Sequence, residues 1–230
     1  RLVQSPQSET VSSESFLTSL RQGYSYISRS GAVLALLFLT VGVALFATPI
    51  VMLLPSFVKY DMAGGPQDLG LLMGVMGAGS LVGALVMVSW ARYPYKARRA
   101  FLAMSLYGLV LVGLSLSKSM FTAGVLLSVM GFCDAVYLAS TMTALQLLVP
   151  SEIRGRVLSV WMSSWGLMAI GLLAMSAIAE RFGVLLAMSS GGVLTLMMVL
   201  LVLGWKPELW SLRDDTAESS SETSYGHPPS

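Results

Sequence analysis

Charged residues are kept apart from apolar residues along this chain, and this separation constrains the fold more than any other feature. Five stretches of 18 to 29 residues carry no charged side chain, namely 30–58, 69–91, 100–117, 157–179 and 182–205. Only 11% of all residues are charged and 55% are hydrophobic, whereas an average soluble chain is about 25% charged. Because roughly 20 apolar residues cross the hydrocarbon core of a bilayer as one helix, each stretch is long enough to span a membrane.

A sixth apolar stretch, residues 120–148, is interrupted by a single charged residue, Asp134. The sequence therefore predicts an all-α polytopic membrane protein with six transmembrane helices. Their expected bounds are about 32–58, 69–90, 100–117, 120–148, 156–179 and 184–204.

Both ends of the chain are polar and are expected to lie outside the bundle, which we place at residues 31–205. Residues 1–30 predict a cytoplasmic linker that contains an amphipathic interfacial helix, with a disordered linker as the alternative. Residues 206–230 predict a disordered cytoplasmic tail. Since the chain begins with arginine rather than methionine, we expect it to be a fragment of a longer protein.

Lysine and arginine residues concentrate on one side of the predicted bundle. Eleven of the 14 would lie on the side that holds both termini, and the other side would hold only Lys59, Lys118 and Arg181. Because the cytoplasmic loops of membrane proteins are enriched in Lys and Arg, both termini are predicted to be cytoplasmic.

Several classes of function are disfavoured by what the chain contains. A net charge of +2, without an arginine- or lysine-rich run, argues against a nucleic-acid partner. One cysteine, Cys133, excludes an intrachain disulfide, and the single histidine, His227, lies in the predicted tail, far from any serine within a span. We therefore expect no catalytic residues, no metal site and no cofactor.

Asp134 is the one charged residue well inside a predicted span, and Tyr137 and Thr141 share its helical face. An ionised aspartate at mid-bilayer costs roughly 2.5–3.5 kcal/mol, so this carboxyl group must face protein or water, or hold a proton. One interpretation is a substrate or proton site that faces a cavity. The other is a carboxyl group held by neighbouring hydroxyl groups, and the sequence favours neither.

Small residues recur at helical spacing in the second span, which predicts close packing against a partner helix. We expect this packing role rather than contact with a ligand. In the first span, Pro49 and Pro55 predict a bend, which is either mobile or static. The glycines of the second span are Gly70, Gly74, Gly79 and Gly83.

A polar stretch, VPSEIRGR at residues 149–156, separates the fourth span from the fifth. It predicts a cytoplasmic turn, in which Pro150 ends the fourth span and Gly155 supplies conformational freedom. Glu152 could pair with arginines of the preceding basic loop in one functional state, or the basic residues could only fix the topology. The candidate gating residues are Arg92, Arg98, Arg99, Glu152, Arg154, Gly155 and Arg156.

Residues 145–183, LQLLVPSEIRGRVLSVWMSSWGLMAIGLLAMSAIAERFG, resemble the region that joins spans ten and eleven of major facilitator superfamily transporters. The resemblance is strongest to the branch of the enterobactin exporter and the macrolide-efflux-like permeases. It extends over about residues 15–204, and includes the segment SLRQGYSYISRS and the glycine-rich span with the basic loop that follows. It departs from the family at SWAR, which lacks a nearby aspartate, and at residues 169–171, which lack a Pro-Leu-Gly step.

The resemblance implies that this chain is the C-terminal half of a transporter, with six helices forming one half of a major-facilitator-type bundle. The leading interpretation is a proton-coupled exporter of small organic molecules such as siderophores or drugs, working by alternating access in the bacterial inner membrane. Its partners would be the lipid bilayer, an N-terminal six-helix half, a small-molecule substrate and protons. The alternative is a non-transporting six-helix scaffold or regulator.

Overall fold

The computed structural model describes residues 30–90 and 96–205. Within these two ranges every regular element is helical and no strand occurs. The prediction of an all-α polytopic membrane fold is confirmed, because six helices are long and apolar enough to cross a membrane: Gly31–Asp61, Pro66–Ser89, Ala97–Leu116, Met120–Leu148, Ser151–Phe182 and Val184–Gly204. Arg92 and the predicted linker and tail fall on residues 1–29, 91–95 and 206–230, outside the described residues.

The first span contains two π-helical turns, η1 and η2, each of which follows an α-helical piece. Pro49, near the start of α3, has no N–H group, so the Leu45 carbonyl four residues earlier cannot accept the usual helical hydrogen bond from it. A π-helical turn just before this proline accommodates the loss and keeps the span continuous. The four pieces are α2 (Gly31–Gly42), η1 (Val43–Ala47), α3 (Thr48–Ser56) and η2 (Phe57–Asp61).

The second span, α4 (Pro66–Ser89), begins earlier than hydropathy alone suggests. Pro66 occupies the first helical turn, where its missing N–H group has no intrahelical partner to lose. Asp68 Oδ2 accepts a hydrogen bond from the Gly65 N–H at 2.8 Å, which caps the helix. A charged residue therefore belongs to the start of this helix, although it interrupts the apolar run.

The third and fourth spans are α5 (Lys96–Leu116) and α6 (Met120–Leu148). Helix α6 ends at Leu148 because the next residue, Val149, precedes a proline and adopts an extended conformation, with φ −106° and ψ 125°. Pro150 is then the N-cap of α7 (Ser151–Ser164). The whole connection between the fourth and fifth spans is thus Val149 and Pro150.

The polar residues after Pro150 are helical, which corrects the expectation of a turn that Gly155 makes flexible. Glu152, Arg154, Gly155 and Arg156 all lie in the first turns of α7. Glu152 is well placed there, because a negative charge is favourable near a helix N-terminus. Gly155 therefore has helical geometry and no special backbone freedom.

The fifth span changes its helical form near its middle. A 3₁₀-helical turn, η3 (Trp165–Leu167), separates α7 from α8 (Met168–Phe182). Gly183, with φ 93°, ends α8 in a conformation that only glycine adopts easily, and α9 (Val184–Trp205) starts at the next residue. Because a 3₁₀-helical turn inside a helix often marks a hinge, the middle of the fifth span is a candidate bending point.

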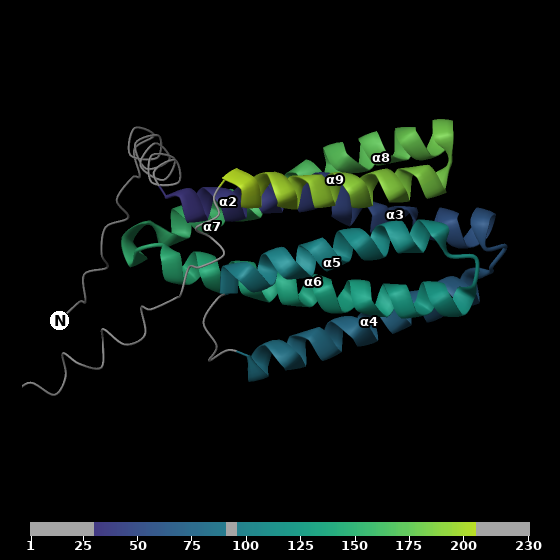
Figure 1. Ribbon diagram of the computed structural model, residues 1–230, viewed down its shortest axis with the longest axis horizontal. Coiled ribbons are helices and arrows are strands. Elements are labelled where there is room, and N and C mark those ends of the chain that lie inside the picture. Colours follow the sequence, from purple (N-terminus) through teal and green to yellow (C-terminus); the bar gives the residue numbers. More distant parts are fainter. Residues whose placement is uncertain (1–29, 91–95, 206–230) are drawn as a thin grey trace, which may run out of the picture.

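Helices α4 and α8 lie at opposite edges of the bundle (Figure 1). Helix α4 packs against α6, α6 against α5, and α5 against α9, while α8 packs against α9 and the first span. Only 17% of the most apolar stretch of α4, and 17% of that of the fifth span, is buried inside the chain, compared with 61% for the first span. Most of the apolar surface of these two spans is therefore left for lipid or for another protein segment.

Glycines bring α4 and α6 into backbone contact. A Cβ atom at Gly79 would overlap the Ser128 carbonyl oxygen, and one at Gly83 would also meet the backbone of α6. Ser80 Oγ adds an interhelical hydrogen bond, which it donates to the Gly131 carbonyl oxygen at 3.1 Å. Association in lipid depends on such close approach, because no hydrophobic effect drives helices together there.

The other two glycines of the predicted stripe lie on a different surface. No atom comes within 4 Å of the position that a Cβ would take at Gly70 or Gly74. The stripe is thus divided between Gly79 and Gly83, which pack against α6, and Gly70 and Gly74, whose faces no part of the described chain covers.

Candidate functional site

A groove of about 980 Å³ lies between α4, α6 and α7. Its wall is almost entirely apolar and is rich in methionine and tryptophan. Arg99, at the start of α5, is the one charged residue among those that line it. The lining residues are Ala84, Met87, Val88, Arg99, Ala135, Leu138, Ala139, Met142, Thr143, Trp161, Met162 and Trp165.

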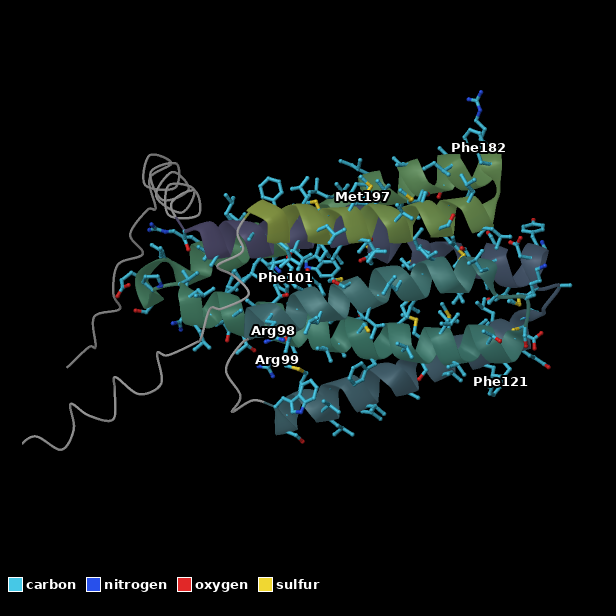
Figure 2. The ribbon with its side chains drawn as sticks, viewed as in Figure 1. Arg98, Arg99, Phe101, Phe121, Phe182 and Met197 are labelled. Carbon is cyan, nitrogen blue, oxygen red and sulfur yellow. The ribbon has the colours of Figure 1, made fainter. Side chains whose placement is uncertain are left out.

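Arg99 lies where α4 ends and α5 begins, at the end of the bundle opposite Phe121 and Phe182 (Figure 2). We call this the basic end, because the arginines at the start of α5 and at the start of α7 lie there. Arg99 Nη1 donates a hydrogen bond to the Trp90 carbonyl oxygen at 2.9 Å, at the C-terminus of α4. This bond anchors the guanidinium group beside the groove, since a cation is favourable at a helix C-terminus. The adjacent Arg98 is exposed.

Two tryptophans from the fifth span form one wall of the groove. Trp161 and Trp165 meet edge to face, with ring centroids 6.2 Å apart and an interplanar angle of 85°. Trp161 belongs to α7 and Trp165 begins the 3₁₀-helical turn. A change in the angle between α7 and α8 would therefore alter this wall.

Thr40 is a hydrogen-bonding centre that joins three spans, and we call it with its partners the Thr40 hub. Its Oγ1 accepts hydrogen bonds from Tyr137 Oη at 3.0 Å and from Trp161 Nε1 at 3.1 Å, and donates one to the Leu36 carbonyl oxygen at 2.9 Å. A hydroxyl group has one donor and two acceptor sites, so Thr40 uses its full capacity. The hub is buried, and only Trp161, at 4% exposure, is not completely enclosed.

The structure places the three residues of the predicted polar stripe in different surroundings. Asp134 is half-buried in α6, one position before Ala135, which lines the groove. Tyr137 and Thr141 are fully buried in the core and are not among the residues that line the groove, so a cavity-facing role for them remains a prediction. The Thr141 hydroxyl group has no hydrogen-bond partner among the described residues.

The candidate gating residues that the structure describes gather at the basic end. Glu152 is exposed and accepts a hydrogen bond from Ser151 Oγ at 2.9 Å. Arg154 Nε donates a weak hydrogen bond to the Val149 carbonyl oxygen at 3.4 Å. Both contacts are local to the junction between α6 and α7, so pairing between Glu152 and the arginines of α5 remains a prediction.

The comparison with known families decides the class of this protein. A family model described as transmembrane secretion effector matches residues 2–227. The chain belongs to this family. The transmembrane secretion effector family is of the major facilitator type, so this secretion effector chain is an integral membrane protein of the transporter class. No curated protein matched the chain.

In this secretion effector chain, sequence analysis overlooked the Thr40 hub and the tryptophan wall. Thr40 lies in a strongly apolar run, and a polar residue at such a place is a signal that it has a partner within the protein. Trp161 and Trp165 are one helical turn apart, which places both rings on one face. Neither signal identifies the partner, because Thr40 and Trp161 are distant in the sequence.

Proposed function

We propose that this chain is the C-terminal six-helix half of a secondary exporter of small organic molecules, such as siderophores or drugs. The exporter would work by alternating access, be driven by the proton gradient, and lie in the bacterial inner membrane with both termini in the cytoplasm. Within the major facilitator type, we place it near the branch of the enterobactin exporter and the macrolide-efflux-like permeases. Family membership supports this proposal, and one structural observation, the position of the groove, supports it further.

The groove lies between α4 and α7, which belong to the two spans with the least buried surface. A second six-helix half that docked on these spans would convert an open groove into a cavity between halves. Secondary transporters hold their substrates at such an interface and alternate access by rocking one half against the other. An apolar wall with tryptophan and methionine suits molecules that have a large apolar body.

Asp134 is the proposed proton site, because among the described residues it is the one acidic residue well inside a span, half-buried and one position before Ala135 of the groove wall. Tyr137 would contribute from the core, through the Thr40 hub that also holds Trp161. The buried Thr141 hydroxyl group has no hydrogen-bond partner among the residues described, and it would offer a nearby polar contact if the stripe changed its conformation.

Transport into inverted membrane vesicles tests the proposal. Vesicles that contain the full-length protein should accumulate compounds from a panel of amphipathic molecules when their interior is acidic, and a protonophore should stop the accumulation. Accumulation that persists without a pH gradient would remove proton coupling from the proposal. If no compound accumulates under either condition, the non-transporting scaffold or regulator becomes the better interpretation.

A further inference from the structure

We propose that the groove recognises amphipathic organic acids, and that Arg99 is the residue that binds their acidic group. This inference rests on the proposed function, since it names the substrate class of the same groove. The acidic group would lie at the basic end, and the apolar body would extend along α6 toward Trp165.

The wall of the groove offers apolar contact and little else. Two of its polar groups are already satisfied, since Thr143 Oγ1 donates to the Ala139 carbonyl oxygen at 2.7 Å and Trp161 Nε1 donates to Thr40. The remaining wall is alanine, leucine, valine, methionine and tryptophan. Methionine side chains adapt to irregular shapes, so this wall favours an apolar body without fixing its outline.

Arg99 breaks this pattern at one end of the groove. Its guanidinium group is planar, permanently charged and shaped to bind a carboxylate through two parallel N–H groups. The hydrogen bond from Nη1 to the Trp90 carbonyl oxygen fixes the side chain in place, which reduces the entropy that binding would cost. No carboxylate is among the residues that line the groove, so an organic cation would meet repulsion without compensation.

Burial strengthens this preference. Arg99 is half-buried against an apolar wall, where the local dielectric is lower than in water and a charged hydrogen bond is correspondingly stronger. Arg98, the next residue, is exposed and does not line the groove. The two arginines carry the same charge at adjacent positions of α5, and of the two only Arg99 lines the groove.

Trp161 and Trp165 provide a direct readout, because a bromine atom quenches tryptophan fluorescence on contact. The full-length protein, in nanodiscs of phosphatidylcholine, is titrated with a bromoalkyl carboxylate and with its primary amide, at a pH well above the pKa of the free acid. Quenching that remains in Trp165→Phe comes from Trp161 and from partition into lipid, so the part of the signal that this substitution removes reports binding beside Trp165. We expect a Kd for the carboxylate that is at least about tenfold lower than for the amide, since hydrogen bonds to charged groups are the stronger class.

Substitutions at the two arginines separate recognition from structure. Arg99→Gln should bring the ratio of the carboxylate Kd to the amide Kd close to one and leave the Kd of the amide unchanged. Arg99→Lys should retain part of the preference for the carboxylate. Arg98→Gln should retain all of it. Equal weakening of acid and amide by Arg99→Gln, or loss of the preference in Arg98→Gln, would overturn the inference.

An anionic lipid is the competing ligand for an arginine at the basic end. We assign the site to a substrate, so adding phosphatidylglycerol to the nanodiscs should raise the Kd of the carboxylate by less than about threefold, a loss expected from surface charge. A much larger rise would show that lipid occupies the site. Binding is measured without a proton gradient and is therefore independent of transport. A preference for the carboxylate in a protein that transports nothing would contradict the export proposal and leave the recognition of organic acids standing.

Discussion

Trp161 Nε1 donates a hydrogen bond to Thr40 Oγ1 across 3.1 Å, and so links the wall of the groove to the first span. Tyr137 donates to the same oxygen atom at 3.0 Å, which brings α6 into the link. The first span changes to a π-helical turn at Val43, one turn after Thr40, and the fifth span changes to a 3₁₀-helical turn at Trp165, one turn after Trp161. The hub therefore lies beside the points at which both spans depart from regular α-helix, and it is well placed to hold one arrangement of them.

Replacing Thr40 with valine removes the acceptor of two buried donors and preserves the shape of the side chain. We expect Thr40→Val to lower the free energy of unfolding by about 1–3 kcal/mol, the usual cost of leaving a buried polar group unsatisfied. Unfolding in mixed micelles with increasing sodium dodecyl sulfate, followed by circular dichroism, measures the change.

Thr141→Val is the matched control, since both threonines are fully buried and Thr40 alone of the two has hydrogen-bond partners within the described residues. Because the Thr141 hydroxyl group has no hydrogen-bond partner in the part of the chain that the structure describes, Thr141→Val should leave the unfolding free energy unchanged or raise it by up to about 1 kcal/mol. Equal destabilisation by the two substitutions would contradict the hub. A stable Thr141→Val protein with impaired export would indicate that this hydroxyl group acts in another state of transport.

The divided glycine stripe predicts a contrast between two positions on α4. Gly79→Ala should destabilise the protein by about 1–3 kcal/mol, because the new methyl group overlaps the Ser128 carbonyl oxygen and forces α4 away from α6. Gly74→Ala should be neutral or slightly stabilising, since its surroundings are open and alanine favours the helix. The same unfolding assay compares them.

A larger side chain at Gly74 tests whether a second half docks on this face. Gly74→Leu should not change the unfolding free energy of this chain expressed alone, and should reduce the export rate of the full-length protein. If Gly74→Leu leaves export at its original rate, this face meets lipid and not another half.

Asp134→Asn tests proton coupling in the full-length protein. The amide has nearly the same size and cannot take up or release a proton, so gradient-driven accumulation in inverted vesicles should fall by about a hundredfold or more, the range in which proton-transfer groups act. Membrane insertion and the Kd of the bromoalkyl carboxylate should be unchanged. Accumulation at the original rate would remove Asp134 from the mechanism.

Charge reversal at the basic end tests the predicted latch between Glu152 and the arginines of α5. Exposed ion pairs contribute about 0–1 kcal/mol, so Glu152→Arg should change the export rate by no more than about fivefold. Combining it with Arg98→Glu should restore part of the rate if the two charges meet in one state. Additive losses in the double variant, measured in the same vesicle assay, would speak against the latch.

Helix starts show where hydropathy alone falls short. The run without charges begins after Asp68, yet α4 begins at Pro66, because Asp68 caps the helix and the proline fits its first turn. The fifth span likewise begins at Ser151 rather than near residue 156, since Pro150 serves as the N-cap and the polar residues after it can be helical while they remain at the surface. Both starts follow from local capping chemistry that a search for apolar residues does not include.

The candidate site was predictable only in part, and for a different reason. Arg99 and Asp134 stand out in the sequence because a charge near or inside a span must be accommodated. Tyr137 and Thr141 share a face with Asp134 along an ideal helix, but the packing of α6 against α2 turns that part of the face into the core. The periodicity of one helix cannot show which neighbour covers it.

The sequence by itself determined which segments lie in the bilayer and how many there are, because transfer into a membrane sums local contributions over about 20 consecutive residues. Only the tertiary structure decided which glycines meet α6, and that the groove forms between α4, α6 and α7. It also decided that Thr40 joins residues 97 and 121 positions away. These contacts arise from packing between helices that are distant in sequence, which no local pattern records.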